Sequence, residues 1–583
     1  MMKRIIREKY GLYLTLVTMV SLFMVFGSGC GTGATSTQDS QSDRSNTGTS
    51  RSTERDYSGM GEEEEEECST ESAQSYTPRN GSSSSTVGLA VGGAKDVNNF
   101  RENINNDYSP LPTDISYEGL FYDYYFDTEE DTECRKLFCP SYSLAIAPDP
   151  FSGKPDYYLS VGLNSGLQER DFQRKKLNLV IVLDISSSMR GEFDRYYYDR
   201  FGNEIDVGYD KMNRKKIEVA LESVISIIDH LDEDDRFGLV LFNGSARLAE
   251  PLVRMDYANI NRLKDRIRKI TTSGSTRLSA GMQMATGLYE DLPYYDPSEY
   301  ENRIIFLTDA MPNQGDTSKT GLLGMAENNA DNRIHTTFIG IGVDFNTELV
   351  DYITRIRGAN YYSVQYAKQF RERMENEFEH MVTPLVFNLQ LTLHARGWDI
   401  LKVYGSPEAD EATGELMKVN TLFPSEKKGG ETRGGIVLLK LKRTGSGHSL
   451  RLRTSYEDRN GNPDYSETSI VFHDETSVLY ENSGIRKAIL LSRYADLMKN
   501  WTIDEREHAH LSYPWNPCVD DEEGIIVPPA LGQWERQSLP LMISECYRVL
   551  FEEFLDYFRY EMGILYDETL SQEVDIMEKL IHY

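Results

Sequence analysis

The sequence predicts an α/β domain with a doubly wound, mostly parallel sheet, followed by a β-rich, sandwich-like domain and a helical C-terminal region. Between residues 177 and 370, short runs of Val, Ile and Leu alternate with longer segments whose apolar residues recur at helical spacing. Strands that are apolar throughout are typical of a parallel sheet covered by helices on both faces. Alternating strand patterns fill residues 381–478, and helical spacing returns over residues 483–583.

Length and charge limit the other possibilities. The 583 residues exceed what one hydrophobic core usually organises, so we expect roughly two to four structural units. The chain has 62 Lys and Arg against 93 Asp and Glu, which gives a formal net charge of -31. Because nucleic-acid binding relies mainly on Lys and Arg, we expect no nucleic-acid partner.

Residues 1–29 have the pattern of an export signal, with basic residues before an apolar stretch and small residues at its end. Cys30 follows the small residues and resembles the acylated cysteine of the lipobox in bacterial lipoproteins. An uncleaved signal anchor is the alternative, because the apolar run has near-spanning length and Gly27 stands where lipoprotein signals usually have Leu. Either interpretation predicts an extracytoplasmic chain tethered to the membrane.

Two segments separate this signal from the α/β domain. Residues 30–95 are rich in Ser, Thr and Gly and contain the acidic run Glu62–Glu67, so we expect a disordered tether. Residues 96–176 form an aromatic-rich N-terminal region whose rings we interpret as packing residues. Within it, Cys134 and Cys139 are close enough for a local disulfide, and buried free thiols are the alternative.

The elements of the α/β domain follow in order along the chain. We expect strands at residues 177–184, 236–244, 303–309 and 334–342, and helices at residues 215–231, 259–270, 278–292, 322–331 and 347–358.

Polar side chains gather where two of these strands end. Asp184, Ser186 and Ser188 follow the first strand at alternate positions, Asp309 closes a later strand, and Thr276 stands in a loop that leads into a helix. Ligands of such folds bind beyond the carboxyl ends of the strands. Two carboxylates and three hydroxyls form an all-oxygen set, which suits a hard cation such as Mg²⁺.

This constellation resembles the metal-ion-dependent adhesion site of von Willebrand factor type A domains, in which Asp-x-Ser-x-Ser is joined by a Thr and an Asp from later loops. The resemblance implies that Ser186, Ser188 and Thr276 approach Mg²⁺, or Mn²⁺ or Ca²⁺, directly or through water. It implies that Asp184 and Asp309 orient bound waters. A carboxylate from a protein partner would take the open coordination position.

The order of segments is also similar to that of bacterial surface lipoproteins that carry this domain. We therefore expect a membrane-tethered protein of the cell envelope that binds a partner in adhesion or envelope assembly. The alternatives are a metal-dependent envelope hydrolase and a structural surface protein with a stabilising metal. We expect no enzyme and assign no catalytic residue, because the sequence contains no Walker loop, no G-x-S-x-G and no HExxH.

A long insertion separates Met189 from Lys215, where few residues usually suffice. Its aromatic residues are interleaved with Arg, a composition typical of protein contact surfaces. A self-packed lid is the alternative interpretation. The candidate contact residues are Tyr196, Tyr197, Tyr198 and Phe201.

Two other patterns are given no metal. In DRNGNPDYSE, which begins at Asp458, the Gly is misplaced for a calcium loop, and Asn460-Gly461 predicts a hairpin turn instead. His508 and His510 have no third ligand nearby, so we interpret them as surface residues.

Overall fold

The computed structural model of the chain describes residues 86–92, 97–112, 114–129, 134–191, 214–290, 298–310, 321–341, 355–364, 377–395, 397–405, 415–445, 449–472, 478–512 and 539–583, with a few single residues between these ranges. Residues 81–583 form one compact unit. No helix among the described residues is long and apolar enough to span a membrane. The expected signal and Cys30 lie outside the described residues.

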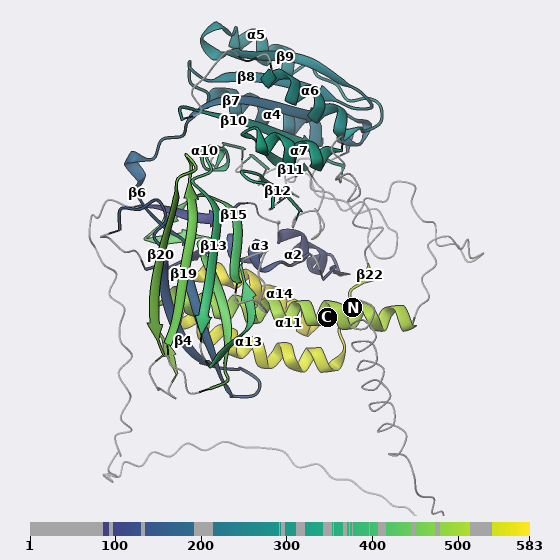
Figure 1. Cartoon of the computed structure of the whole chain (residues 1–583). Coiled ribbons are helices and arrows are strands. Elements are labelled where there is room, and N and C mark those ends of the chain that lie inside the picture. Colours follow the sequence, from purple (N-terminus) through teal and green to yellow (C-terminus); the bar gives the residue numbers. More distant parts are fainter. Residues whose placement is uncertain are drawn as a thin grey trace, which may run out of the picture. The chain divides into compact units, whose positions relative to one another are not determined.

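The α/β domain contains a six-stranded sheet in the order β12-β11-β10-β7-β8-β9 (Figure 1). Its strands are β7 (Lys176–Asp184), β8 (Arg236–Phe242), β9 (Ala246–Arg254), β10 (Tyr300–Thr308), β11 (Ile334–Ile341) and β12 (Asn360–Val364). Neighbouring strands are parallel except β8 and β9. The predicted doubly wound, mostly parallel sheet is therefore confirmed, with two edge strands, β9 and β12, that the sequence analysis does not predict.

Helices cover both faces of this sheet. Every side chain of β7 from its second residue is therefore buried. Leu179 and Ile181 point to the face that also buries side chains of α4 and α5. Val180 and Val182 point to the opposite face, which buries side chains of α6 and α7. The bounds are α4 (Lys216–Asp229), α5 (Ile260–Ile267), α6 (Leu278–Glu290) and α7 (Leu322–Asp331).

The β-rich part is a sandwich of two antiparallel sheets, with orders β20-β19-β13-β15-β1-β6 and β14-β18-β5-β4-β21. Its strands are β1 (Thr86–Val91), β4 (Ser141–Pro148), β5 (Pro155–Gly162), β6 (Asn164–Gln168), β13 (Val386–Ala395), β14 (Trp398–Tyr404), β15 (Glu415–Ser425), β18 (Ile436–Arg443), β19 (Ser449–Asp458), β20 (Pro463–Val471) and β21 (Leu479–Tyr480). Leu89, Leu159 and Leu391 meet in its core.

The sandwich departs from the expected order of domains. Both sheets combine strands from before and after the α/β domain, so the α/β domain is inserted into the sandwich. β5 pairs with β18, and β1 pairs with β15 and β6. β1 falls within residues 30–95, the predicted tether, yet Leu89 is fully buried. The strands of residues 96–176 and 381–478 thus form one domain rather than two.

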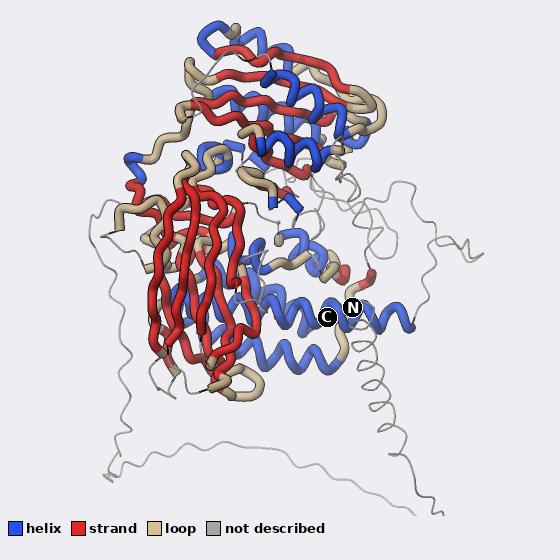
Figure 2. The backbone as a smooth tube through the Cα atoms, in the orientation of Figure 1, coloured by secondary structure: helices blue, strands red, loops and turns tan. Residues whose placement is uncertain are grey.

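Helices from both ends of the described chain form a third layer (Figure 2). They pack on the outer face of the five-stranded sheet through Ala145, Tyr158 and Leu438. The bounds are α2 (Asn98–Asn105), α3 (Tyr117–Tyr122), α11 (Ser483–Ser512), α13 (Glu545–Leu565) and α14 (Ser571–His582), with the short α10 (Phe378–Met381) at the end of the α/β domain. Small sheets join β3 (Tyr125–Phe126), β16 (Lys427–Lys428) and β17 (Glu431–Arg433), and β2 (Tyr108–Ser109) with β22 (Leu539–Pro540).

Candidate metal centre

Two neighbouring parallel strands end side by side at the candidate site. Leu183 of β7 lies opposite Leu307 of β10, so the next residues, Asp184 and Thr308, are neighbours as well. The Thr308 hydroxyl donates a hydrogen bond to Asp184 Oδ2 over 2.7 Å. Asp309 follows Thr308 directly, which brings the second carboxylate to the same edge of the sheet.

The Asp184 carboxylate is fixed by its own loop. The side chain is buried, and its Oδ1 accepts a hydrogen bond from the backbone N–H of Ser186 at 2.8 Å. Burial raises the pKa of Asp184 above its ordinary value and the charge of Asp309 adds to the rise, while the hydrogen bonds from Ser186 and Thr308 oppose it. A buried carboxylate whose oxygens are held by donors is suited to orienting waters around a cation.

Hydrogen bonds between side-chain oxygens connect the loop after β7, which carries Ser186 and Ser188, with Asp309 after β10. Ser186 Oγ lies 2.9 Å from Ser188 Oγ, and the Ser188 hydroxyl donates to Asp309 Oδ1 over 2.7 Å. Ser186 is buried and Ser188 is exposed, so this chain of oxygen atoms runs from the sheet edge to the surface. The structure therefore brings together Asp184, Ser186, Ser188 and Asp309.

The loop that carries Thr276 lies against the first loop. The backbone N–H of Ser187 donates to the Gly274 carbonyl at 3.0 Å, and the backbone N–H of Ser273 donates to the Ile185 carbonyl at 2.7 Å. Gly274 has a φ of +83°, which favours glycine at this crossing. The Thr276 side chain is exposed, and among the described residues no hydrogen bond joins it to the other four.

One charged residue of the site, Lys216, is not part of the predicted set. Lys216, the first residue of α4, places its Nζ 3.3 Å from Asp309 Oδ2. The Asp309 side chain is nearly fully buried and that of Lys216 is mostly buried. The ammonium therefore compensates one of the two carboxylates where a cation would lie. In the sequence, only the position of Lys216 at the start of α4 could have indicated this contact, because α4 begins at the sheet edge where β7 ends.

The donor set fits a hard divalent cation. The described residues contain no group of three or more His, Cys, Asp and Glu side chains that could hold a metal ion. The loops offer carboxylate and hydroxyl oxygens instead, the ligands that Mg²⁺ and Ca²⁺ prefer. Their oxygens are suited to cation binding, and the Ser188 end of the set is exposed.

The remaining predicted site residues have different outcomes. Cys30 and the contact residues Tyr196, Tyr197, Tyr198 and Phe201 lie outside the described residues. A disulfide joins Cys134 and Cys139 in the loop before β4. The side chains of His508 and His510 also lie outside the described residues.

The segment that begins at Asp458 forms the turn between β19 and β20. Asp458 Oδ1 accepts hydrogen bonds from the backbone N–H groups of Asn460 and Asn462 at 2.8 and 2.9 Å, and Gly461 has a φ of +88°. The carboxylate therefore holds the turn itself, as expected for a hairpin rather than a calcium loop.

Comparison with known proteins identifies the central domain. Residues 179–312 match the family model of the von Willebrand factor type A domain. Inter-alpha-trypsin inhibitor heavy chain H1 from Mesocricetus auratus is 20% identical over 311 residues, covering 52% of this chain and 29% of that protein. The Homo sapiens heavy chain H1 is 25% identical over 222 residues, covering 37% and 21%. The chain thus spans less than a third of the length of these relatives.

Solved structures with a similar arrangement include the von Willebrand factor type A protein from Catenulispora acidiphila, with 16% identity, coverage of 64% of this chain and 81% of that chain, and a TM-score of 0.36. The ArnB paralog VWA2 from Sulfolobus acidocaldarius has 13% identity, coverage of 76% and 97%, and a TM-score of 0.35. Proximal thread matrix protein 1 from the mussel byssus, with a zinc-occupied MIDAS motif, has 17% identity, coverage of 35% and 46%, and a TM-score of 0.25.

Proposed function

From the von Willebrand factor type A domain that this chain contains, we propose that the protein binds a protein partner through a divalent cation at the edge of the parallel sheet. Asp184, Ser186, Ser188, Thr276 and Asp309 hold the cation. A carboxylate of the partner takes the coordination position that these residues leave open. The observation that supports this most directly is the hydrogen-bonded set formed by Asp184, Ser186, Ser188 and Asp309.

Each residue has a distinct task in this proposal. The hydroxyls of Ser186 and Ser188 face the cation, because they lie next to each other in the oxygen chain that leads to the exposed Ser188 and carry no charge of their own. Asp184, with both oxygens already bound by donors, holds waters rather than the cation itself. Thr276 stands on a neighbouring loop with an exposed hydroxyl, so a small loop shift brings it to the cation when the partner binds.

The place of action is proposed from the N-terminal sequence. A basic segment, an apolar run and Cys30 after small residues support export and a membrane anchor, by lipid or by an uncleaved signal. A disulfide between Cys134 and Cys139 is in keeping with an oxidising compartment. A protein that is tethered outside the membrane and binds partners through a cation would serve adhesion or assembly of the envelope.

Calorimetric titration of Mg²⁺ and Mn²⁺ into the full chain tests the cation site. We expect saturable binding that the Ser186→Ala/Ser188→Ala variant loses. Ser187→Ala is the matched control, because Ser187 lies between the two and contributes only its backbone N–H to the loop contact. Lys216→Met should bind the cation about tenfold more tightly, since the competing ammonium is gone. Absence of binding by the unaltered chain would refute the proposal.

Partner capture tests the proposed binding of a protein partner through the cation. Capture by the full chain of a partner that presents an acidic side chain should disappear with EDTA and with Asp184→Ala, while the melting temperature of the variant stays within a few degrees of the unaltered chain. A cation that only stabilises the fold gives the opposite result, because its removal lowers the melting temperature and leaves capture intact.

A further inference from the structure

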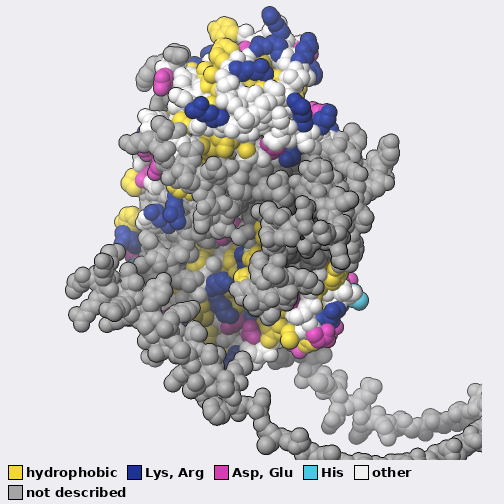
Figure 3. Space-filling view, turned by 90° about the vertical axis from the view of Figure 1, so that its right-hand side faces the viewer, with side chains coloured by type: hydrophobic (Ala, Val, Ile, Leu, Met, Phe, Trp, Pro, Cys, Tyr) yellow, Lys and Arg dark blue, Asp and Glu magenta, His cyan; other side chains and the backbone are white. Residues whose placement is uncertain are grey.

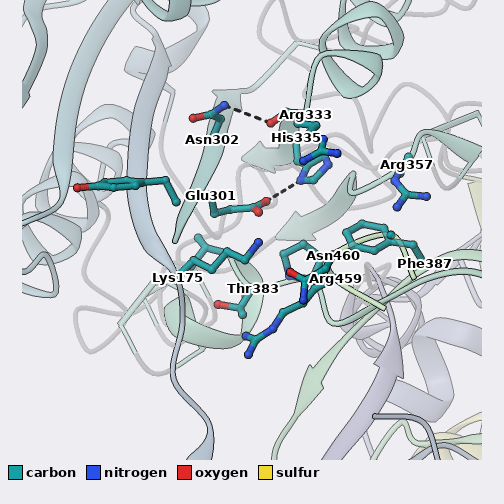
Figure 4. Close-up of a pocket in the computed structure, with 14 residues that line it drawn as sticks. Lys175, Glu301, Asn302, Arg333, His335, Arg357, Thr383, Phe387, Arg459 and Asn460 are labelled. Carbon is teal, nitrogen blue, oxygen red and sulfur yellow. Dashed lines mark hydrogen bonds and ion pairs between the residues drawn. The ribbon is translucent and has the colours of Figure 1, made fainter. Parts of the chain in front are cut away.

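A second candidate site lies at the opposite edge of the same sheet. It is an open pocket of about 710 Å³, counted with the solvent at its mouth. β10 and β11 contribute the residues at their amino-terminal ends, including Glu301 and His335, and the turn between β19 and β20 contributes Arg459 (Figure 4). Parallel strands have all their carboxyl ends at one edge, so this pocket and the candidate metal centre are separate sites.

The pocket is basic although the chain carries a net charge of -31. Lys175, Arg333, Arg357 and Arg459 line it, from four separate segments of the chain, and Glu301 is the only acidic residue among the described residues of the lining. Basic residues are unevenly distributed elsewhere too, because Figure 3 shows Lys and Arg side chains gathered over the top of the α/β domain. The negative total therefore does not describe the local field.

The acidic side chain is already paired. Glu301 Oε1 lies 3.0 Å from the buried guanidinium of Arg303 and 2.6 Å from His335 Nδ1. Arg357 is also engaged, since its Nη1 lies 2.8 Å from Glu457 Oε2 and its guanidinium lies 4.2 Å from the centre of the Phe387 ring. Arg333 and Arg459 take part in none of these pairs.

The backbones at Arg333 and Arg459 have defined conformations, while their side chains are unpaired among the described residues. Within the part of the chain that the structure describes, no hydrogen bond or ion pair is made by either guanidinium. Arg333 has a φ of +58°, a left-handed conformation that costs free energy for a residue other than glycine and is often found at functional positions. Arg459 sits in the turn that the Asp458 carboxylate fixes.

We propose that this pocket binds a tetrahedral oxyanion, a phosphate or sulfate group, with Arg333 and Arg459 as its main donors. A guanidinium presents a fork of N–H groups that matches two oxygens of such an anion. Lys175 adds a point charge, and the exposed side-chain amide of Asn460, next to Arg459, adds a further donor. The two negative charges of such an anion would offset the excess of positive side chains that line the pocket.

The test uses the full chain with EDTA present, so that the candidate metal centre is not loaded. Inorganic phosphate, inorganic sulfate and acetate are titrated in turn and heat is measured. We expect saturable binding of phosphate, of sulfate or of both at about 1 mM or tighter, and weaker binding of acetate. Arg333→Gln/Arg459→Gln should weaken binding at least tenfold and leave the melting temperature without anion unchanged. The relative affinities for phosphate and sulfate identify which anion the pocket takes.

Arg453→Gln is the matched control, because Arg453 lies on β19 with its side chain exposed and does not line the pocket. It should bind like the unaltered chain. Absence of saturable binding by the unaltered chain overturns the proposal, as does an equal loss in Arg453→Gln, which would mark a response to total charge. If the double variant unfolds, Arg459→Gln alone decides, since it leaves the strained position at Arg333 untouched.

Discussion

At the scale of single residues, Lys427 and Lys428 form a natural pair for measuring the effect of burial on a charge. They are adjacent in β16, yet burial lowers the pKa of Lys427 to about 8. Lys428 is exposed, and its hydrogen bond with Tyr125 and its pairing with Glu426 raise its pKa instead. Lys427 donates to the Thr86 hydroxyl at 3.2 Å.

Lys427→Met should therefore stabilise the protein at pH 7 by about 1–2 kcal/mol, a value reduced because the side chain is only partly buried. Between the folded pKa near 8 and the unfolded value of 10.5, the unfolded chain binds more protons, so the unaltered protein gains stability as pH rises. Urea denaturation at pH 7 and pH 10 should show the advantage of Lys427→Met shrinking at the higher pH. Lys428→Met should show no gain at either pH, and an equal gain would contradict burial as the cause.

Residue spacing predicted part of the candidate centre and not the rest. Asp184, Ser186 and Ser188 come to one edge because the strand ends at Asp184 and a short helical turn, Ser187–Arg190, follows at once. The contact of Lys216 with Asp309 could not be predicted, because a lysine at a helix start looks the same in sequence whether it faces solvent or a carboxylate. The side-chain position of Thr276 likewise depends on a loop crossing at Gly274 that no local pattern encodes.

At the scale of elements, a buried ionic network joins the first described helix to the last. Arg101 of α2 contacts Glu573 of α14, with a distance of 3.1 Å from Nε to Oε1, and Tyr124 donates to the same oxygen over 2.8 Å. Arg101 also pairs with Asp123 at 2.7 Å. The Glu573 side chain is fully buried and that of Arg101 is nearly so. The network therefore links two helices that are more than 450 residues apart in the sequence.

Glu573→Leu should destabilise the protein by about 3–5 kcal/mol, because it leaves the Arg101 guanidinium buried with half of its compensation. Arg101→Met/Glu573→Leu should recover part of that loss, since the buried Arg101 charge is gone and Asp123, which loses its partner, has a side chain that is 20% exposed. The exposed pair of Arg559 and Glu578, which joins α13 to α14, is the control, and Glu578→Gln should cost less than about 1 kcal/mol. Urea denaturation midpoints measure all three; a double variant as unstable as Glu573→Leu would show that packing, not charge, dominates.

The elements that the sequence failed to predict share weak patterns. β9 is an edge strand with no fully buried side chain, and it contains Pro251, a residue that usually interrupts a strand. β1 has an apolar pattern of only six residues, interrupted by Gly88 and preceded by a Ser run. Both segments become strands because they pair with neighbouring strands, and their own residues give little indication of it. β7 and β10, by contrast, contain enough apolar residues for a strand to be predicted from the sequence alone.

At the scale of the whole molecule, the sequence predicted the kinds of domain and not how the chain is threaded through them. Residues 155–162 pair on one side with residues 141–148, which are near in sequence, but on the other side with residues 436–443, beyond the entire α/β domain. Alternation indicates which side chains are buried and says nothing of which strand lies beside them. The boundary at residue 96 was misplaced for the same reason, because β1 gains its place only from β15 and β6.

A truncation series tests this threading. A chain that begins at Gly81 keeps β1, and one that begins at Asp96 removes a strand from between β15 and β6 together with the buried side chains of Val87 and Leu89. Burial of two aliphatic side chains is worth about 3–6 kcal/mol, so the shorter chain should unfold at clearly lower urea concentration. Leu89→Ala in the longer chain should fall between the two, at a cost of about 2–5 kcal/mol. Equal midpoints for the two truncations would show that β1 contributes nothing to the sandwich, and that the folded unit begins where the helix α2 does.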